Sequence, residues 1–266
     1  QIRFQMLRFI STTAAMAFVT HPMLALTVTP TNDAGQLVSN LLGDGSTLAG
    51  TPSLTAPDGA VGTFTDGLSA GLLFDSGIIL TTGFAADAVG PNTAPDSGDG
   101  VGGPGSSVLG DDTFDAATLT FDFVAEGPEL TLTFAFASEE YNEFVDAGSN
   151  DGLAVLLDGA NIALTPGGEA VSVATINGAS NPDLFVDNSG EIDADTGELA
   201  PGSAPFNLAF DGFTTALTAT ASGLASGPHT LSLVIADRGD GFVDSAVFVA
   251  AESLSAPGAA PDPDPG

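Results

Sequence analysis

Two-residue alternation between apolar and small or polar side chains recurs in many short segments of this 266-residue chain. In "ELTLTFAFAS" (129–138), leucine and phenylalanine alternate with threonine and alanine, so one face of the predicted strand is apolar. Segments such as "ATLTFDFVA", "HTLSLVIAD" and "DSAVFVAAESL" repeat the pattern between turns of glycine, proline, aspartate and asparagine. Many short strands without intervening helices predict an all-β fold, an antiparallel β-sandwich of jelly-roll type.

Local signals predict three other features. "TNDAGQLVSNLLG" (31–43) predicts one short N-terminal helix, which Thr31, Asn32 or Asp33 can cap and Gly43 can end. Asp158-Gly159 between two apolar runs predicts a hairpin turn. "NTAPDSGDGVGGPGSS" (92–107) predicts a long glycine-rich loop.

The charge balance excludes several classes of partner and site. The chain has 34 acidic residues against 3 basic ones, and Arg238 is the single basic residue after Arg8. Such a chain lacks the clustered lysine and arginine that nucleic acids and anionic membranes require. It also has no cysteine, which excludes disulfides, thiol nucleophiles and thiolate metal sites. A hydrophobic content of 43% with 18 phenylalanines nevertheless predicts a sizeable folded core.

The two ends of the chain differ from its middle. Residues 1–25 predict a signal peptide that starts at Met6, has an early Arg8 and an apolar stretch, and is cleaved after Ala25. We expect one domain over residues 26–255, and a truncated linker rich in proline and aspartate over residues 256–266. No later apolar run is long enough to predict a transmembrane segment. The sequence therefore predicts a protein outside the cytoplasm.

Carboxylates follow two of the predicted strands. Continuing the alternation of residues 130–136 puts Glu140 on the core side, and counting by two from Leu231 does the same for Asp237. A carboxylate at the edge of an apolar core costs several kcal/mol, roughly, unless a positive charge or hydrogen bonds compensate it. If the two strands are neighbours, their loops can converge on one cation.

The acidic residues predict a calcium site, because Ca²⁺ binds 6 to 8 oxygen atoms and the expected domain has one histidine and no cysteine for zinc. The predicted metal ligands are Glu139, Glu140, Asn150, Asp151, Asp237, Asp240 and Asp244. The alternative is that these loops are solvated acidic surface. The loop "DNSGEIDADTGE" (187–198) hints at a second calcium site but lacks the EF-hand glycine and glutamate. We expect His229 at the surface and Tyr141 as a partly buried anchor with a bonded hydroxyl.

Several segments resemble a known family. "DSGIILTTGFAADAVGPN", "FAFASEEYNEFVDAGSNDGLAVLLDGANIAL" and "IADRGDGFVDSAVFVAAESL" are similar to successive signatures of the choice-of-anchor L domain. This is a bacterial secreted and surface domain, and the resemblance covers nearly the whole expected mature chain. It implies location and architecture rather than a biochemical activity or a cofactor.

Three classes of function remain open. The first is a non-catalytic structural or adhesive module, stabilised by calcium, that is secreted or displayed on a bacterial surface. Its partners would be cell-surface or matrix components, including glycans or further copies of itself. The second is a calcium-dependent, lectin-like carbohydrate binder, which fold analogy supports and the scarcity of tyrosine and tryptophan opposes. The third is a glycoside hydrolase using two carboxylates from Glu139, Glu140, Glu143 and Asp151.

Overall fold

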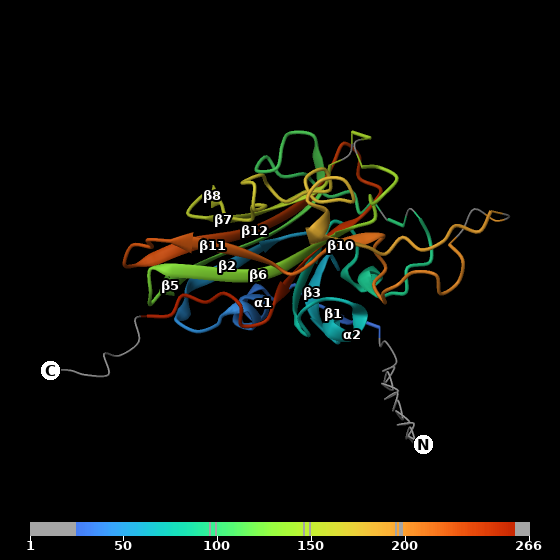
Figure 1. Ribbon diagram of the computed structural model, residues 1–266. Coiled ribbons are helices and arrows are strands. Elements are labelled where there is room, and N and C mark those ends of the chain that lie inside the picture. Colours follow the sequence, from blue (N-terminus) through green and yellow to red (C-terminus); the bar gives the residue numbers. More distant parts are fainter. Residues whose placement is uncertain are drawn as a thin grey trace, which may run out of the picture.

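The computed structural model describes residues 25–258, apart from positions 96, 99, 146, 149, 195, 197 and 198. The predicted signal peptide, except its last residue, and most of the predicted linker lie outside the described residues, as do two of the acids in the 187–198 loop. The described chain forms two antiparallel sheets packed face to face (Figure 1). The predicted all-β sandwich is therefore confirmed.

The larger sheet has eight strands. Its order is β1-β3-β4-β13-β6-β10-β9, and β11 also pairs with β6. Their bounds are β1 Thr27–Pro30, β3 Val61–Thr65, β4 Gly77–Thr81, β6 Glu129–Ser138, β9 Phe185–Asp187, β10 Gly212–Thr214, β11 Leu217–Ser222 and β13 Ser245–Ala250.

The smaller sheet has five strands in the order β2-β5-β12-β7-β8. Their bounds are β2 Ser46–Thr55, β5 Thr113–Ala125, β7 Gly152–Leu157, β8 Ala160–Asn161 and β12 Pro228–Arg238. Along the chain, β4, β6 and β13 lie in the larger sheet, whereas β5, β7 and β12 lie in the smaller one. This alternation, with β13 between β4 and β6 and β12 between β5 and β7, is the jelly-roll arrangement that the sequence predicted.

The predicted helix is α1, Ala34–Leu41. Asp33 caps it, because its side chain accepts a hydrogen bond from the Gln36 amide at 3.0 Å. Gly43 matters for a different reason from the predicted one: a side chain there would collide with the Glu252 carbonyl, so glycine permits close backbone approach. Short helical turns that the sequence analysis did not predict are α2 Gly67–Ala70, η1 Ala85–Ala88 and η2 Pro182–Leu184.

The predicted turn at Asp158-Gly159 joins β7 and β8. Both residues have positive φ, 50° and 84°, as a two-residue hairpin turn of type I′ requires. Glycine fits the second position and aspartate tolerates the first. The predicted turn is confirmed.

Two apolar clusters bury both faces of the larger sheet near one end. The main cluster lies between the sheets and includes Phe134, Phe136 and Val247. The alternate residues of the same strands, such as Ala137 and Phe248, belong to a second cluster on the outer face. Leu26, α2, η1 and the segment near Phe210 contribute to that cluster. The sheet is therefore buried on two sides where β6 ends.

Candidate functional site

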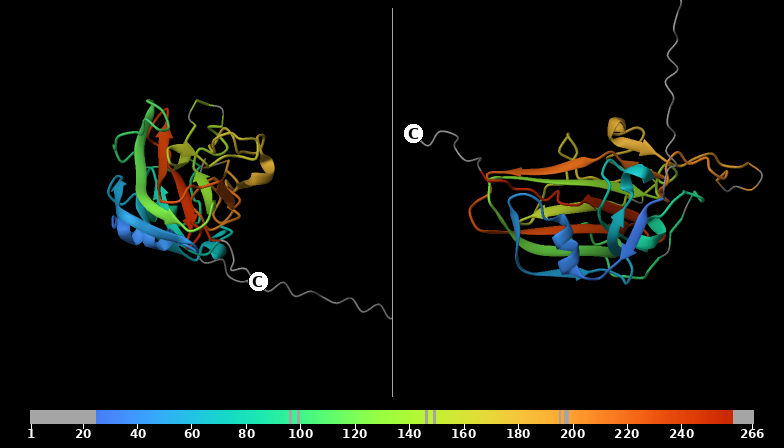
Figure 2. Two further views of the ribbon diagram at one scale, coloured as in Figure 1. Left: turned by 90° about the vertical axis from the view of Figure 1, so that its left-hand side faces the viewer. Right: turned by 90° about the horizontal axis from the view of Figure 1, so that it is seen from below.

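The two acidic loops are neighbouring crossovers between the sheets. Residues 139–151 lead from β6 in the larger sheet to β7 in the smaller one, and residues 239–244 lead from β12 to β13. Ser138 pairs with Ser245, and Gly152 pairs with Ala236. β6 and β12 are thus in different sheets, but their following loops cross at the same end of the sandwich, away from the C-terminal end of the described chain (Figures 1 and 2).

Five of the seven predicted ligands are buried where these crossovers begin or end. Asp151 and Asp237 are 1% exposed, Glu139 and Glu140 are 2% exposed, and Asp244 is 8% exposed. The alternation of β6 and β12 accounts for Glu140 and Asp237. Glu139 lies on the opposite face, and the second apolar cluster buries that face as well.

Asp151 connects three of these strand ends. Its Oδ1 accepts a hydrogen bond from the Arg238 amide at 2.9 Å, and its Oδ2 accepts one from the Ser245 hydroxyl at 2.8 Å. Its own amide donates to Glu140 Oε2 at 3.3 Å. Burial raises the pKa of Asp151, while the bonds from Arg238 and Ser245 lower it in part. Asp151 therefore ties the ends of β6, β12 and β13 to the start of β7.

Asp237 has no such compensation. Both of its carboxylate oxygens are buried, and neither accepts a hydrogen bond of normal geometry from the described residues. Burial raises the pKa of Asp237, and the nearby negative charge of Asp151 raises it further. The Thr82 side chain is close enough to lower that pKa, but it does not form a bond of normal geometry. Without an ion, Asp237 is therefore a buried carboxyl group that keeps its proton at neutral pH beside Asp151.

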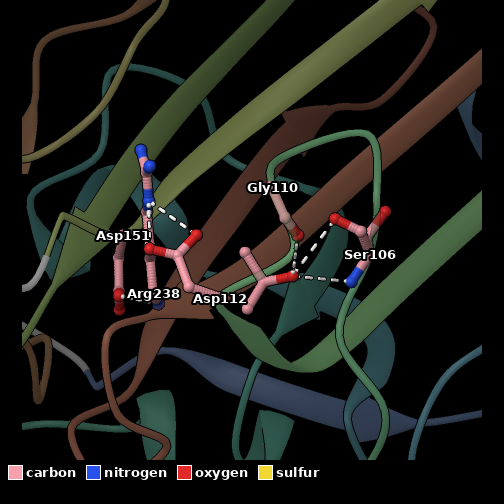
Figure 3. A network of polar contacts seen from close by, with 6 residues as sticks. Ser106, Gly110, Asp112, Asp151 and Arg238 are labelled. Carbon is pink, nitrogen blue, oxygen red and sulfur yellow. Dashed lines mark hydrogen bonds and ion pairs between the residues drawn. The ribbon is translucent and has the colours of Figure 1, made fainter.

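The single arginine of the domain is directed elsewhere. The Arg238 guanidinium Nε contacts Asp112 Oδ1 at 3.2 Å, and both of these side chains are exposed. Figure 3 shows the guanidinium at Asp112, whereas only the backbone amide of Arg238 reaches Asp151. Arg238 therefore does not supply its charge to the buried carboxylates.

Asp244 and Glu139 are two further buried carboxylates, and they contact each other. The Glu139 amide donates to the Asp244 carbonyl at 3.0 Å, and the two side chains line one cavity. The Asp244 carboxylate lies against Gly83, where a β-carbon would collide with it. Gly83 therefore makes room for this carboxylate.

The remaining two predicted ligands lie at the margin. The Asn150 side-chain oxygen accepts a hydrogen bond from the Ala174 amide at 2.9 Å, which braces the following loop. Asp240 is exposed, and its carboxylate accepts a bond from the Phe242 amide at 3.3 Å. Its charge still raises the pKa of Asp151. As the side chains stand, no group of three or more His, Cys, Asp or Glu over the described ranges is placed so that it could hold a metal ion.

Several residues beside the buried carboxylates were not predicted from the sequence. Ser245 and Gly83 serve the buried carboxylates, and Asp87 lines the cavity beside Glu139. The continued alternation of β13 could have indicated Ser245. The prediction for His229 was wrong: it is 8% exposed, and its ring nitrogens contact Asp158 at 2.7 Å and the Ala225 carbonyl at 2.9 Å. Tyr141 is fully buried, and its hydroxyl donates to the Ile176 carbonyl at 2.7 Å.

A sequence profile described as "Choice-of-anchor L domain" matches residues 27–255, nearly all of the described chain. The chain belongs to the choice-of-anchor L family. No curated protein and no solved structure matches it significantly. Membership in the choice-of-anchor L family implies a surface or secreted module of bacteria. In the described part of this domain, no helix is long and apolar enough to cross a membrane.

Proposed function

We propose that this choice-of-anchor L domain is a non-catalytic structural or adhesive module in which calcium stabilises the junction of the two sheets. The observation that carries the proposal is Asp237, which is buried beside Asp151 and Asp244 with both oxygens unbonded to the described residues. A buried carboxylate without a partner is strongly destabilising. Because Arg238 faces Asp112, an external cation is the compensation that suits this cluster.

Calcium suits the available ligands better than zinc or magnesium does. Ca²⁺ accepts 6 to 8 oxygens in flexible geometry, including carboxylates, carbonyls and water. His229 already contacts two acceptors, and the chain has no cysteine, so the usual zinc ligands are missing. Magnesium demands a near-ideal octahedron and keeps several of its waters. Asp237, Asp151 and Asp244 would hold the ion, with Glu139 and Glu140 beside them and Asn150 and Asp240 at the margin.

Such an ion would act at the crossovers. These carboxylates lie in, or at the strand ends next to, two loops that each connect the larger sheet to the smaller one. At a calcium concentration of about 100 times Kd, binding stabilises the folded state by about 2.7 kcal/mol. For a domain of this size, that amounts to a rise of about 5–10 °C in Tm.

The arrangement gives less support to hydrolysis. A glycoside hydrolase needs an acid and a second carboxylate that face the same bound sugar. Of the four candidates from the sequence, Glu139 is the one that lines the cavity of about 300 Å³ beside the cluster, while Glu143 is exposed on the crossover loop. We therefore infer a non-catalytic role, with cell-surface or matrix components as partners.

The experiment compares Glu140→Gln with Glu143→Gln. Glu140 is buried and bonded to the Asp151 amide, whereas Glu143 is exposed two residues beyond Tyr141. We expect the parent and Glu143→Gln to gain about 5–10 °C in Tm on calcium addition and Glu140→Gln to lose most of that gain. Thermal melts in chelator and in calcium, at one fixed ionic strength, measure this. A parent Tm that does not respond to calcium would refute the proposed site.

A further inference from the structure

A cavity of about 300 Å³ lies beside the carboxylate cluster and opens to the surface. Glu139 and Asp244, both almost fully buried, contribute to its wall, and Asp87 of η1 adds a third carboxylate. The cavity therefore shares two residues with the proposed calcium site. Its volume is at the lower end of the range for small-molecule sites, which suits a single sugar ring.

The lining combines two kinds of surface. Thr81, Thr93 and Ser97 provide hydroxyl groups near the carboxylates. Phe84, which is 41% exposed, and Phe210 provide aromatic surface, and Val89 and Pro91 complete the apolar part of the wall. Apolar walls with a few polar groups that fix orientation are typical of specific ligand sites.

The charges of the lining restrict the ligand. All of its ionisable residues are carboxylates, so phosphate, sulfated sugars and sugar acids would be repelled. A neutral sugar suits the cavity, because its hydroxyls can donate to carboxylate and hydroxyl oxygens while its C–H face packs on Phe84. The scarcity of tyrosine and tryptophan in the sequence argued against a surface on which a sugar could stack. The exposed Phe84 supplies such a surface.

We infer that the cavity bordered by Phe84, Glu139 and Asp244 binds one neutral sugar unit of a surface or matrix glycan. The inference rests on the proposed function, because calcium bound to Glu139 and Asp244 would offset the negative charge of the wall. A cationic amine or guanidinium group is the competing ligand, since it would need no calcium and would be attracted by the same carboxylates.

The test uses Phe84→Ala, with Phe242→Ala as the matched control. Phe242 is 71% exposed and does not line this cavity. The parent is screened against an array of neutral and acidic oligosaccharides with calcium and with chelator, and titration calorimetry then measures the bound neutral glycan. We expect calcium-dependent binding of neutral glycans, weakened about tenfold or more in Phe84→Ala and unchanged in Phe242→Ala.

Thermal melts distinguish a failure of the sugar-site inference from a failure of the calcium proposal. Phe84→Ala should keep the full calcium shift in Tm, which also shows that it folds. If the parent shows that shift but binds no neutral glycan, the sugar site is refuted and the calcium proposal stands. If Tm does not respond to calcium, the proposed function fails as well. Binding of a lysine-rich peptide in chelator, abolished by Phe84→Ala, would instead assign the cavity to a cationic ligand and overturn the inference.

Discussion

Asp237 is the buried acid on which the proposed calcium site depends most. It is 1% exposed, its oxygens are unbonded to the described residues, and Asp151 and Asp244 are its charged neighbours. Asp151 is equally buried but accepts two hydrogen bonds, from Arg238 and Ser245. The two aspartates therefore differ in hydrogen bonding although their burial is the same, and this difference is the basis of the proposed site.

Asp237→Asn tests this residue directly. Asparagine keeps the shape of the side chain and cannot carry a negative charge. We expect the calcium-free variant to be about as stable as the parent near pH 7, because burial raises the pKa of Asp237 to about 10 and its side chain is then neutral without an ion. The calcium shift in Tm should fall by more than half. Melts of parent and variant in chelator and in calcium give both values, and an undiminished shift would remove Asp237 from the site.

Gly83 gives a second test at single-residue scale. A β-carbon at this position would collide with the Asp244 carboxylate. A β-carbon at Gly178 would have no such neighbour within 4 Å. We expect Gly83→Ala to lower the free energy of unfolding by about 1–3 kcal/mol through overpacking, and to reduce the calcium shift because Asp244 must move. Gly178→Ala is the control and should lower neither the free energy of unfolding nor the calcium shift. Chemical denaturation with and without calcium measures both.

At the scale of the elements, the sequence predicted what depends on local pattern. Alternation within β6 and β12 put Glu140 and Asp237 on the core side. Other local signals predicted the Asp158-Gly159 turn and gave Asp33 as one of three possible helix caps. The burial of Glu139 could not be predicted, because the second apolar cluster on the outer face of β6 comes from residues distant in sequence. His229 was misplaced for the same reason, since its partner Asp158 is 71 residues away.

The pair of His229 and Asp158 joins β12 to the β7–β8 turn. Both ring nitrogens of His229 face acceptors, Asp158 and the Ala225 carbonyl, which favours the doubly protonated ring. The hydrogen bond that His229 donates to Asp158 is the largest cause both of the raised pKa of His229 and of the lowered pKa of Asp158. The pair therefore stabilises the fold below the unfolded histidine pKa of about 6.5 and loses this contribution as pH rises through the folded value.

His229→Gln should reveal that pH dependence. Asp158 keeps its charge down to its own lowered pKa, so the pair contributes fully between about pH 4 and pH 6.5. We expect the variant to lose about 1 kcal/mol near pH 5.5, a few degrees in Tm, and less near pH 8.5. Melts across this pH range provide the measurement, with Asp158→Asn expected to show the same trend. A deficit that grows with pH would contradict the protonated pair.

At the scale of the whole molecule, the charge balance and the fold act together. The chain carries 34 acidic residues, and all but two of them lie in the expected domain with its one arginine, which favours expansion by self-repulsion. The jelly roll keeps most acids on exposed loops and turns but buries several at the crossovers, where its two sheets are connected. Two electrostatic costs follow. Exposed charges are relieved by any salt, whereas buried ones are relieved by protonation or by a cation that enters the cluster.

Salt titration distinguishes these two costs. Raising sodium chloride from about 0.1 M to about 1 M shortens the Debye length from about 10 Å to about 3 Å, so repulsion among exposed carboxylates is screened. We expect the Tm of the calcium-free parent and of Glu140→Gln to rise together with salt, because surface screening does not involve the buried cluster. Adding calcium at the highest salt should then raise the Tm of the parent further and that of Glu140→Gln much less. A parent that no longer responds to calcium at high salt would show that calcium acts only as a screening ion, because a cation held among the buried carboxylates is protected from the ionic atmosphere.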